Sequence, residues 1–194
     1  MERINELKGK VFHTALKHGW YDEKTTLVKE VMLIISELGE AINADREGRY
    51  AQKGMFMRQS ATPQPEPEKH WNFCFELFIK DTVEDELADA VIRILSYAGY
   101  IKVDLSNIGL TEEAVLKSVD FISSIPRKRE LTFPEELYIA TDDLLATVSG
   151  TASMGEVLLD LFVLAKRKNI DLLWFVEQKM KYNESRPYKH GKIY

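Results

Sequence analysis

Apolar residues recur at intervals of three and four along most of this 194-residue chain, and this spacing restricts its fold more than any other feature. The spacing places apolar side chains on one face of an α-helix. Only 10 glycines and 6 prolines interrupt it, and no convincing alternating strand pattern occurs. With 45% hydrophobic residues the chain can bury a substantial core. We therefore predict one all-α domain over residues 1–194.

Breaks in the apolar pattern predict where the helices begin and end. Between residues 59 and 69, three prolines in five positions predict an extended loop that interrupts the helical pattern. Helices are expected on both sides of this loop, at about 2–18, 27–46, 71–80, 86–100, 111–125, 134–150, 154–168 and 170–182.

Charge and cysteine content exclude several classes of function. The 26 Lys and Arg residues against 31 Asp and Glu residues give a net charge of -5, which offers no general attraction to nucleic acid or to an anionic membrane. One cysteine, Cys74, rules out an internal disulfide and a CxxC metal site. The N-terminus lacks a signal-peptide apolar block, and no apolar run approaches ~20 residues. We expect a soluble, cytoplasmic protein.

Two acidic couplets, Glu37/Glu40 and Glu86/Asp89, each lie within a predicted helix. Residues three apart on a helix project into the same space, so each couplet can supply two carboxylates to one ligand. Both couplets have apolar neighbours, and burial would bring four negative charges together unless a cation offset them. The alternative is a solvated helix face, and for the second couplet an acidic helix start favoured by the helix dipole.

Four carboxylates without a histidine or cysteine favour a hard cation, Mg²⁺ or Mn²⁺, which also takes ligands from substrate phosphates. A ferritin-like di-iron bundle would require Glu-x-x-His pairs. No histidine has a glutamate three residues before it; the four are His13, His18, His70 and His190.

The couplets resemble the metal motifs of the MazG-like, all-α NTP pyrophosphatase superfamily, EExxE on one helix and ExxD on a later one. Glu37 and Glu40 match the second and last acids of EExxE, whereas Ser36 replaces the first acid. Glu86 and Asp89 match ExxD. The resemblance implies that these four carboxylates are the metal ligands and the catalytic residues, and the missing acid puts a second metal in doubt.

The C-terminal sequence, from Lys179 to Lys192, resembles the KMxYNxxRPxxHGK tail of a MazG-like subgroup. Without this resemblance the tail would be interpreted as a disordered basic terminus. With it, phosphate-binding roles are implied for Asn183, Arg186, His190 and Lys192, although Asn183 could instead cap the preceding helix.

The resemblance implies hydrolysis of a nucleoside triphosphate to its monophosphate and pyrophosphate. The nucleotide itself stays open among dUTP, dCTP, damaged and canonical NTPs. One of the four ligand carboxylates, or the nearby Glu30, could accept the proton of the attacking water. Four aromatic residues could stack on a base, although core packing is the more usual role of such side chains: Trp20, Tyr21, Trp71 and Phe73. Two alternatives are a phosphoribosyl-ATP pyrophosphohydrolase and a non-enzymatic helical interaction module.

The resemblance covers about 20–105 and 170–192, which leaves an extra helical stretch at about 106–169. Residues 89–105 superpose without gaps on 156–172, as a duplicated helical hairpin would, although chance similarity of two amphipathic helices is the alternative. MazG-like proteins assemble as dimers or tetramers, so the resemblance implies a homo-oligomer. With a duplication, a single chain could form a pseudo-dimer and remain monomeric.

Overall fold

The computed structural model describes residues 2–103 and 112–191, and this part of the chain is all-α, as predicted. It contains nine α-helices, one 3-10 helix and no strand. Their bounds are α1 Glu2–Lys17, α2 Leu27–Arg46, α3 Lys53–Ser60, α4 Pro67–Phe78, α5 Val83–Tyr100, α6 Glu112–Ser124, α7 Phe133–Ser149, α8 Met154–Arg167, α9 Leu172–Glu184 and η1 Tyr188–Gly191.

Local capping fixes the helix ends that matter for the site. Thr26 precedes α2 and accepts a hydrogen bond from the N–H of Lys29, and Thr82 precedes α5 and accepts from the N–H of Asp85. α5 therefore begins at Val83, three residues earlier than predicted, and its first turn contains Glu86.

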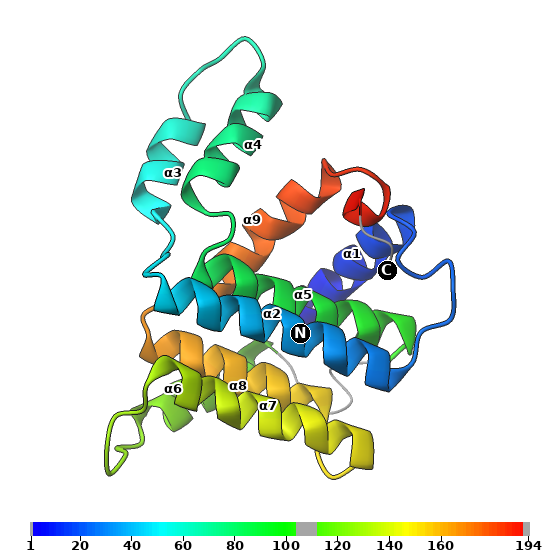
Figure 1. The fold of residues 1–194 in the computed structure, drawn as a ribbon, viewed down its shortest axis with the longest axis vertical. Coiled ribbons are helices and arrows are strands. Elements are labelled where there is room, and N and C mark those ends of the chain that lie inside the picture. The colour runs from blue at the N-terminus through cyan, green and yellow to red at the C-terminus, as the bar shows by residue number, and fades with distance from the viewer. Residues whose placement is uncertain (1, 104–111, 192–194) are drawn as a thin grey trace.

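The proline-rich loop is shorter than the predicted 59–69. The helix α3 lies before it and was not predicted, and α4 begins at Pro67 because a proline without an N–H is tolerated in the first turn of a helix. The loop proper is limited to residues 61–66. In Figure 1, α3 and α4 form a hairpin that projects from the rest of the molecule.

Two helix pairs form the centre of the fold (Figure 1). In the first pair, α2 and α5, Glu37 meets Arg93, and the carbonyl of Arg49 accepts from the N–H of Val83, so the two helices are antiparallel. The second pair is α7 and α8. Because α2 packs on α7 and α5 on α8, the pairs form a four-helix bundle. Fully buried side chains of all four helices meet in its core: Ile34, Leu87, Leu137 and Leu161.

The helices α1 and α9 pack against α5, outside this bundle. Gly99 allows α1 to approach, since a Cβ there would lie 2.5 Å from the Cβ of Phe12. The C-terminal segment folds back on the turn after α1: the N–H of Lys189 donates to the carbonyl of His18 at 2.9 Å. Gly19 has φ +75°, and its missing side chain leaves room for the ring of Tyr188.

The extra stretch predicted at 106–169 is helical in its described part and supplies α6, α7 and α8 before the C-terminal helix α9. The superposed segments lie in α5 and α8, which occupy corresponding places in the two pairs; Asp104, Leu105 and the predicted start at Thr111 lie outside the described residues. Within that part of the chain, no helix combines the length and the apolarity needed to cross a membrane.

Candidate functional site

Three of the four predicted metal ligands converge between α2 and α5. Carboxylate oxygens of Glu37, Glu40 and Glu86, the acidic cluster, all lie within 4.8 Å of one another. Glu37 and Glu86 are buried, with 4% and 5% of their surface exposed, whereas Glu40 is open to solvent. The antiparallel packing of the two helices explains this meeting, because it sets the middle of α2 against the first turn of α5.

Asp89, the fourth predicted ligand, lies beside the cluster but is bound to a cation of α9. Lys179 Nζ lies 2.9 Å from Asp89 and 2.7 Å from Asp85. Only 4% of Lys179 is exposed. Burial lowers the pKa of this ammonium, but Asp89 and Asp85 outweigh that effect and hold the pKa well above its usual range.

A second acidic group shares Glu86 with the first: oxygens of Asp81, Asp85 and Glu86 also lie within 4.8 Å of one another. Its two aspartates already have cations, since Lys80 donates to Asp81 and Lys179 donates to Asp85. In the described part of the chain, no lysine or arginine forms an ion pair with Glu40 or Glu86. The uncompensated charge therefore lies in the acidic cluster.

Burial, together with the negative charges of Asp85 and Asp89, raises the pKa of Glu86 to about 8. Burial likewise raises the pKa of Glu37, against the opposing effect of Arg93, whose Nε donates to Glu37 at 2.5 Å. Arg93 thus compensates one side of the cluster. The buried carboxylates of Glu37 and Glu86 repel each other when both are ionised. A bound cation would reduce this repulsion.

The donor atoms fit a hard divalent cation. All three are carboxylate oxygens from helices held by the core, and the exposed Glu40 leaves one side open for water or a ligand. Mg²⁺ and Mn²⁺ prefer such oxygen ligands and retain open coordination positions. The residues Glu37, Glu40 and Glu86 could therefore hold such an ion.

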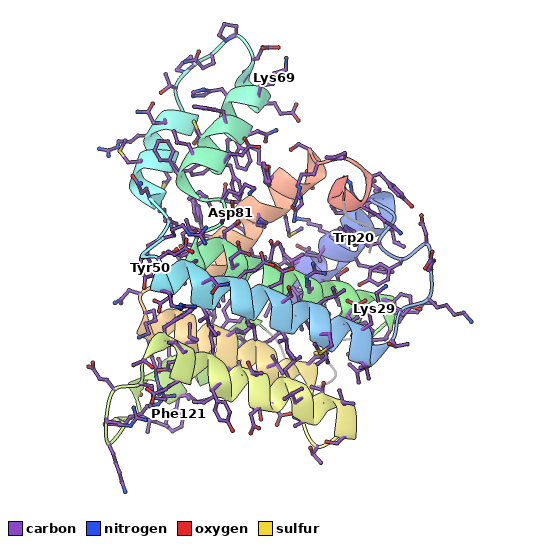
Figure 2. The ribbon with its side chains drawn as sticks, viewed as in Figure 1. Trp20, Lys29, Tyr50, Lys69, Asp81 and Phe121 are labelled. Atoms are coloured by element: carbon purple, nitrogen blue, oxygen red, sulfur yellow. The ribbon has the colours of Figure 1, made fainter. Side chains whose placement is uncertain are left out.

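A cavity of about 120 Å³ adjoins the cluster and is lined by residues of α1, α2, α5 and the C-terminal segment. Glu37 and Asp89 belong to its wall. Figure 2 shows two other lining residues, Trp20 and Lys29, near the turns that join α1 to α2, whereas Asp81 and Tyr50 lie towards the opposite end of α2 and α5.

The C-terminal segment supplies cations to this pocket. Asn183 and Arg186, both predicted from the tail motif, line it, and so does Lys189, which was not predicted. His190 belongs to η1, but its side chain and the whole of Lys192 lie outside the described residues. The order of residues 185–191 differs from the disordered tail that composition alone would suggest.

Sequence reasoning missed several other residues of the site. Lys179 begins the tail motif, which could have indicated it, but its partners on α5 were not predictable. Arg93 follows Asp89 by one helical turn and so lies on the same face, a spacing that could have pointed to it. Ser96, whose hydroxyl is 2.9 Å from that of Tyr21, lines the pocket and carried no recognisable motif.

Comparisons of the chain with protein-family models, with curated proteins and with solved structures found no match.

Proposed function

We propose that the protein is a Mg²⁺-dependent pyrophosphohydrolase that cleaves nucleoside triphosphates between the α and β phosphates. The observation that carries this proposal is the position of the acidic cluster beside a pocket whose lining includes Arg186 and Lys189. Carboxylates for a cation and basic side chains for phosphate are the two requirements of phosphoryl-transfer chemistry. The resemblance of both acidic couplets and of the tail to MazG-like enzymes gives independent support.

In this proposal the protein groups bind and orient the triphosphate. Glu37, Glu40 and Glu86 would hold the cation, which would supply polarisation of phosphoryl oxygens and a lower pKa for a water molecule. Arg186 offers a planar fork of N–H donors to phosphate oxygens, and Lys189 adds a positive charge. Both neutralise charge that would otherwise be repelled by the acidic cluster.

Asp89 is the carboxylate best placed to accept the proton of the attacking water. It lines the pocket and is not part of the acidic cluster. Lys179 fixes its position through the 2.9 Å contact. A general base must lie within hydrogen-bond reach of its proton, and this arrangement keeps Asp89 at the junction of cluster and pocket.

The test is release of pyrophosphate from a panel of nucleoside triphosphates, with and without Mg²⁺, with both products identified. Glu40→Gln should lower turnover by about 100-fold or more, because one carboxylate of the cation site is lost. Glu40 is exposed, so the variant should fold like the wild type. Asp142→Asn, an exposed acid of α7, is the matched control and should retain full activity.

Undiminished turnover in Glu40→Gln would exclude the acidic cluster as the catalytic site. Nucleoside diphosphate and inorganic phosphate as products would exclude the proposed bond. Absence of turnover on every nucleotide, together with no thermal shift on addition of Mg²⁺, would favour the non-enzymatic module.

A further inference from the structure

The outer faces of α2 and α7 carry the same pattern of uncharged residues. On α2, positions separated alternately by four and three residues form one line along the helix: Val28, Met32, Ile35, Gly39 and Ile42. The same spacing on α7 gives Pro134, Tyr138, Thr141, Leu145 and Val148. These positions form the outer seam, which is mainly apolar and contains no charged side chain. On α2 the line ends at Arg46, which is exposed.

Much of the outer seam faces solvent. Five of its side chains are large and apolar, and each has between 47% and 67% of its surface exposed: Val28, Met32, Tyr138, Leu145 and Val148. Figure 1 shows α2 and α7 side by side and running in opposite directions, so that the two halves of the seam adjoin. Monomeric proteins rarely expose a continuous apolar surface on this scale, and such a surface is typical of an interaction site.

The spacing of the seam indicates what kind of partner fits. Alternating steps of four and three repeat every 3.5 residues, which is the period of a helix that packs lengthwise on another helix. The core residues Val31, Ile34 and Leu38 of α2 follow the same rule, and α5 and α7 pack on this helix. The outer seam has the same period on the exposed face. A pair of antiparallel helices with similar spacing is therefore the shape that complements it.

Gly39 lies in the middle of the seam, and packing within the described chain does not explain it. A Cβ at this position would meet no atom within 4 Å. Glycine in the interior of a helix is less favourable than alanine, so its presence calls for a reason. Close approach of another backbone is one of the uses of glycine. Gly39 thus points, independently of the exposed side chains, to a helix that approaches this face.

We propose that the outer seam binds the outer seam of a second copy of the chain, in a two-fold dimer with Gly39 at the closest approach of the helices. A second copy supplies what the seam requires, an antiparallel helix pair with the 3.5-residue period. A two-fold contact uses the same surface of both partners. Each chain carries a net charge of -5, and the absence of charged side chains in the seam lets two copies meet there without like charges in contact.

The size of the seam fits a reversible dimer. α2 has 20 residues and α7 has 17, which correspond to roughly 30 and 25 Å of helix. Two helices side by side are roughly 20 Å wide, so the contact covers on the order of 500 Å² on each copy and 1,000 Å² in total. This total lies near the lower limit for a specific interface, and we expect a dissociation constant in the micromolar range.

Sedimentation velocity of the full chain, at concentrations from about 1 to 200 µM, tests the proposal. We expect a reversible change from monomer to dimer as the concentration rises. A monomer at every concentration would overturn the second copy as the occupant of the seam.

Met32→Glu and Leu145→Glu place a carboxylate on each half of the seam. Each should weaken dimerisation by at least tenfold, because the charge would be buried in the contact without a cation. Both side chains are more than half exposed, so helical content and thermal unfolding at low concentration should match the wild type. Phe121→Glu is the matched control on α6, which packs on α1 and α8, and should dimerise normally (Figure 2). Unchanged dimerisation of both seam variants would overturn the proposed surface.

Gly39→Leu tests the close approach. Leucine adds apolar surface and would strengthen a dimer whose helices stay apart at this point. At close approach its side chain would hold the helices apart, so we expect dimerisation to weaken by at least tenfold. Thermal unfolding at low concentration should not shift downward, since leucine favours a helix more than glycine does. A dissociation constant equal to or below that of the wild type would overturn the position assigned to Gly39.

Discussion

The two helix pairs of the bundle share one architecture but differ in how they compensate charge. In the first pair, α2 and α5, Arg93 pairs with Glu37 of the acidic cluster, and no lysine or arginine among the described residues pairs with its other two glutamates. In the second pair, α7 and α8, Glu136 is compensated by both Arg127 and Arg167. Two arginines thus compensate the buried Glu136 of the second pair, whereas Glu40 and Glu86 of the first pair have no such partner among the described residues.

Two positions explain this difference. The superposition that aligns α5 with α8 sets Ser153 against Glu86, and Ser153 is the N-cap of α8. The helical turn that carries Glu86 therefore has no counterpart in the second pair. The same alignment sets Asp160 against Arg93, and Asp160 hydrogen-bonds Asp143 instead of compensating it. The second pair therefore lacks the helical turn that carries Glu86, and an aspartate stands where Arg93 compensates Glu37 in the first pair.

Replacement of Lys179 should have the largest effect on stability. Lys179→Met keeps roughly the length of the side chain but leaves the buried Asp85 and the partly buried Asp89 without their cation, and should cost about 3–5 kcal/mol of unfolding free energy. Chemical denaturation measures this loss. Arg127→Met is the matched change in the second pair and should cost less, since Arg167 still lies 3.8 Å from Glu136. Equal losses would contradict the contrast between the pairs.

Loss of the Glu86 carboxylate, which belongs to both acidic groups, should abolish the stabilisation and the turnover that depend on Mg²⁺. For Glu86→Gln we expect a loss of about 100-fold or more in Mg²⁺-dependent turnover and no thermal stabilisation by Mg²⁺. The wild type should gain about 2.7 kcal/mol at a Mg²⁺ concentration 100 times its dissociation constant. Thermal unfolding with increasing Mg²⁺ tests this. Asp143→Asn in the second pair should be stabilised by Mg²⁺ as the wild type is. If Asp143→Asn also lost this stabilisation, Mg²⁺ would not be specific to the acidic cluster of the first pair.

Stability without metal should fall as pH rises from about 5 to 8. The pKa of Glu86 is raised from 4.5 to about 8, so the folded state holds more protons than the unfolded state between these values. Deprotonation in this range therefore destabilises the fold, and Mg²⁺ should remove most of the effect. We expect a decrease of several degrees in Tm across the range without Mg²⁺. A flat or rising Tm would show that the cluster carries little unfavourable charge.

The smallest effect is expected at the aspartate pair of α7 and α8. Burial and the hydrogen bond to Asp143 raise the pKa of Asp160 from 3.8 to about 7, so this pair destabilises the fold as it ionises near neutral pH. Asp143→Asn should stabilise the protein at pH 8 by at most about 1 kcal/mol, because solvent screens the partly exposed pair. The gain should vanish at pH 4. Denaturant midpoints at the two pH values measure it, and a loss of stability at pH 8 would contradict the interpretation.

Sequence reasoning predicted α2 within its observed bounds, because its apolar stripe and the Thr26 cap are local features. It failed at α3 and at the start of α4. The helix α3 is short and has Phe56 as its one buried side chain, so its sequence has no periodic apolar stripe. Pro67 was assigned to the loop, although proline is well suited to the first turn of a helix. The spacing of the two couplets placed Glu37, Glu40, Glu86 and Asp89 on helices but did not indicate which of them would meet.

The sequence by itself determined that the chain is helical and that two of its helices carry acidic residues flanked by apolar ones. Both are local properties, because the 3.6-residue period of a helix can be detected from the spacing of neighbouring residues. Only the tertiary structure decided that Glu86 joins Glu37 and Glu40 while Asp89 binds Lys179. Such partners come from helices far apart in the chain. Their meeting depends on the direction and register with which α2, α5 and α9 pack, and these are set by the shared core.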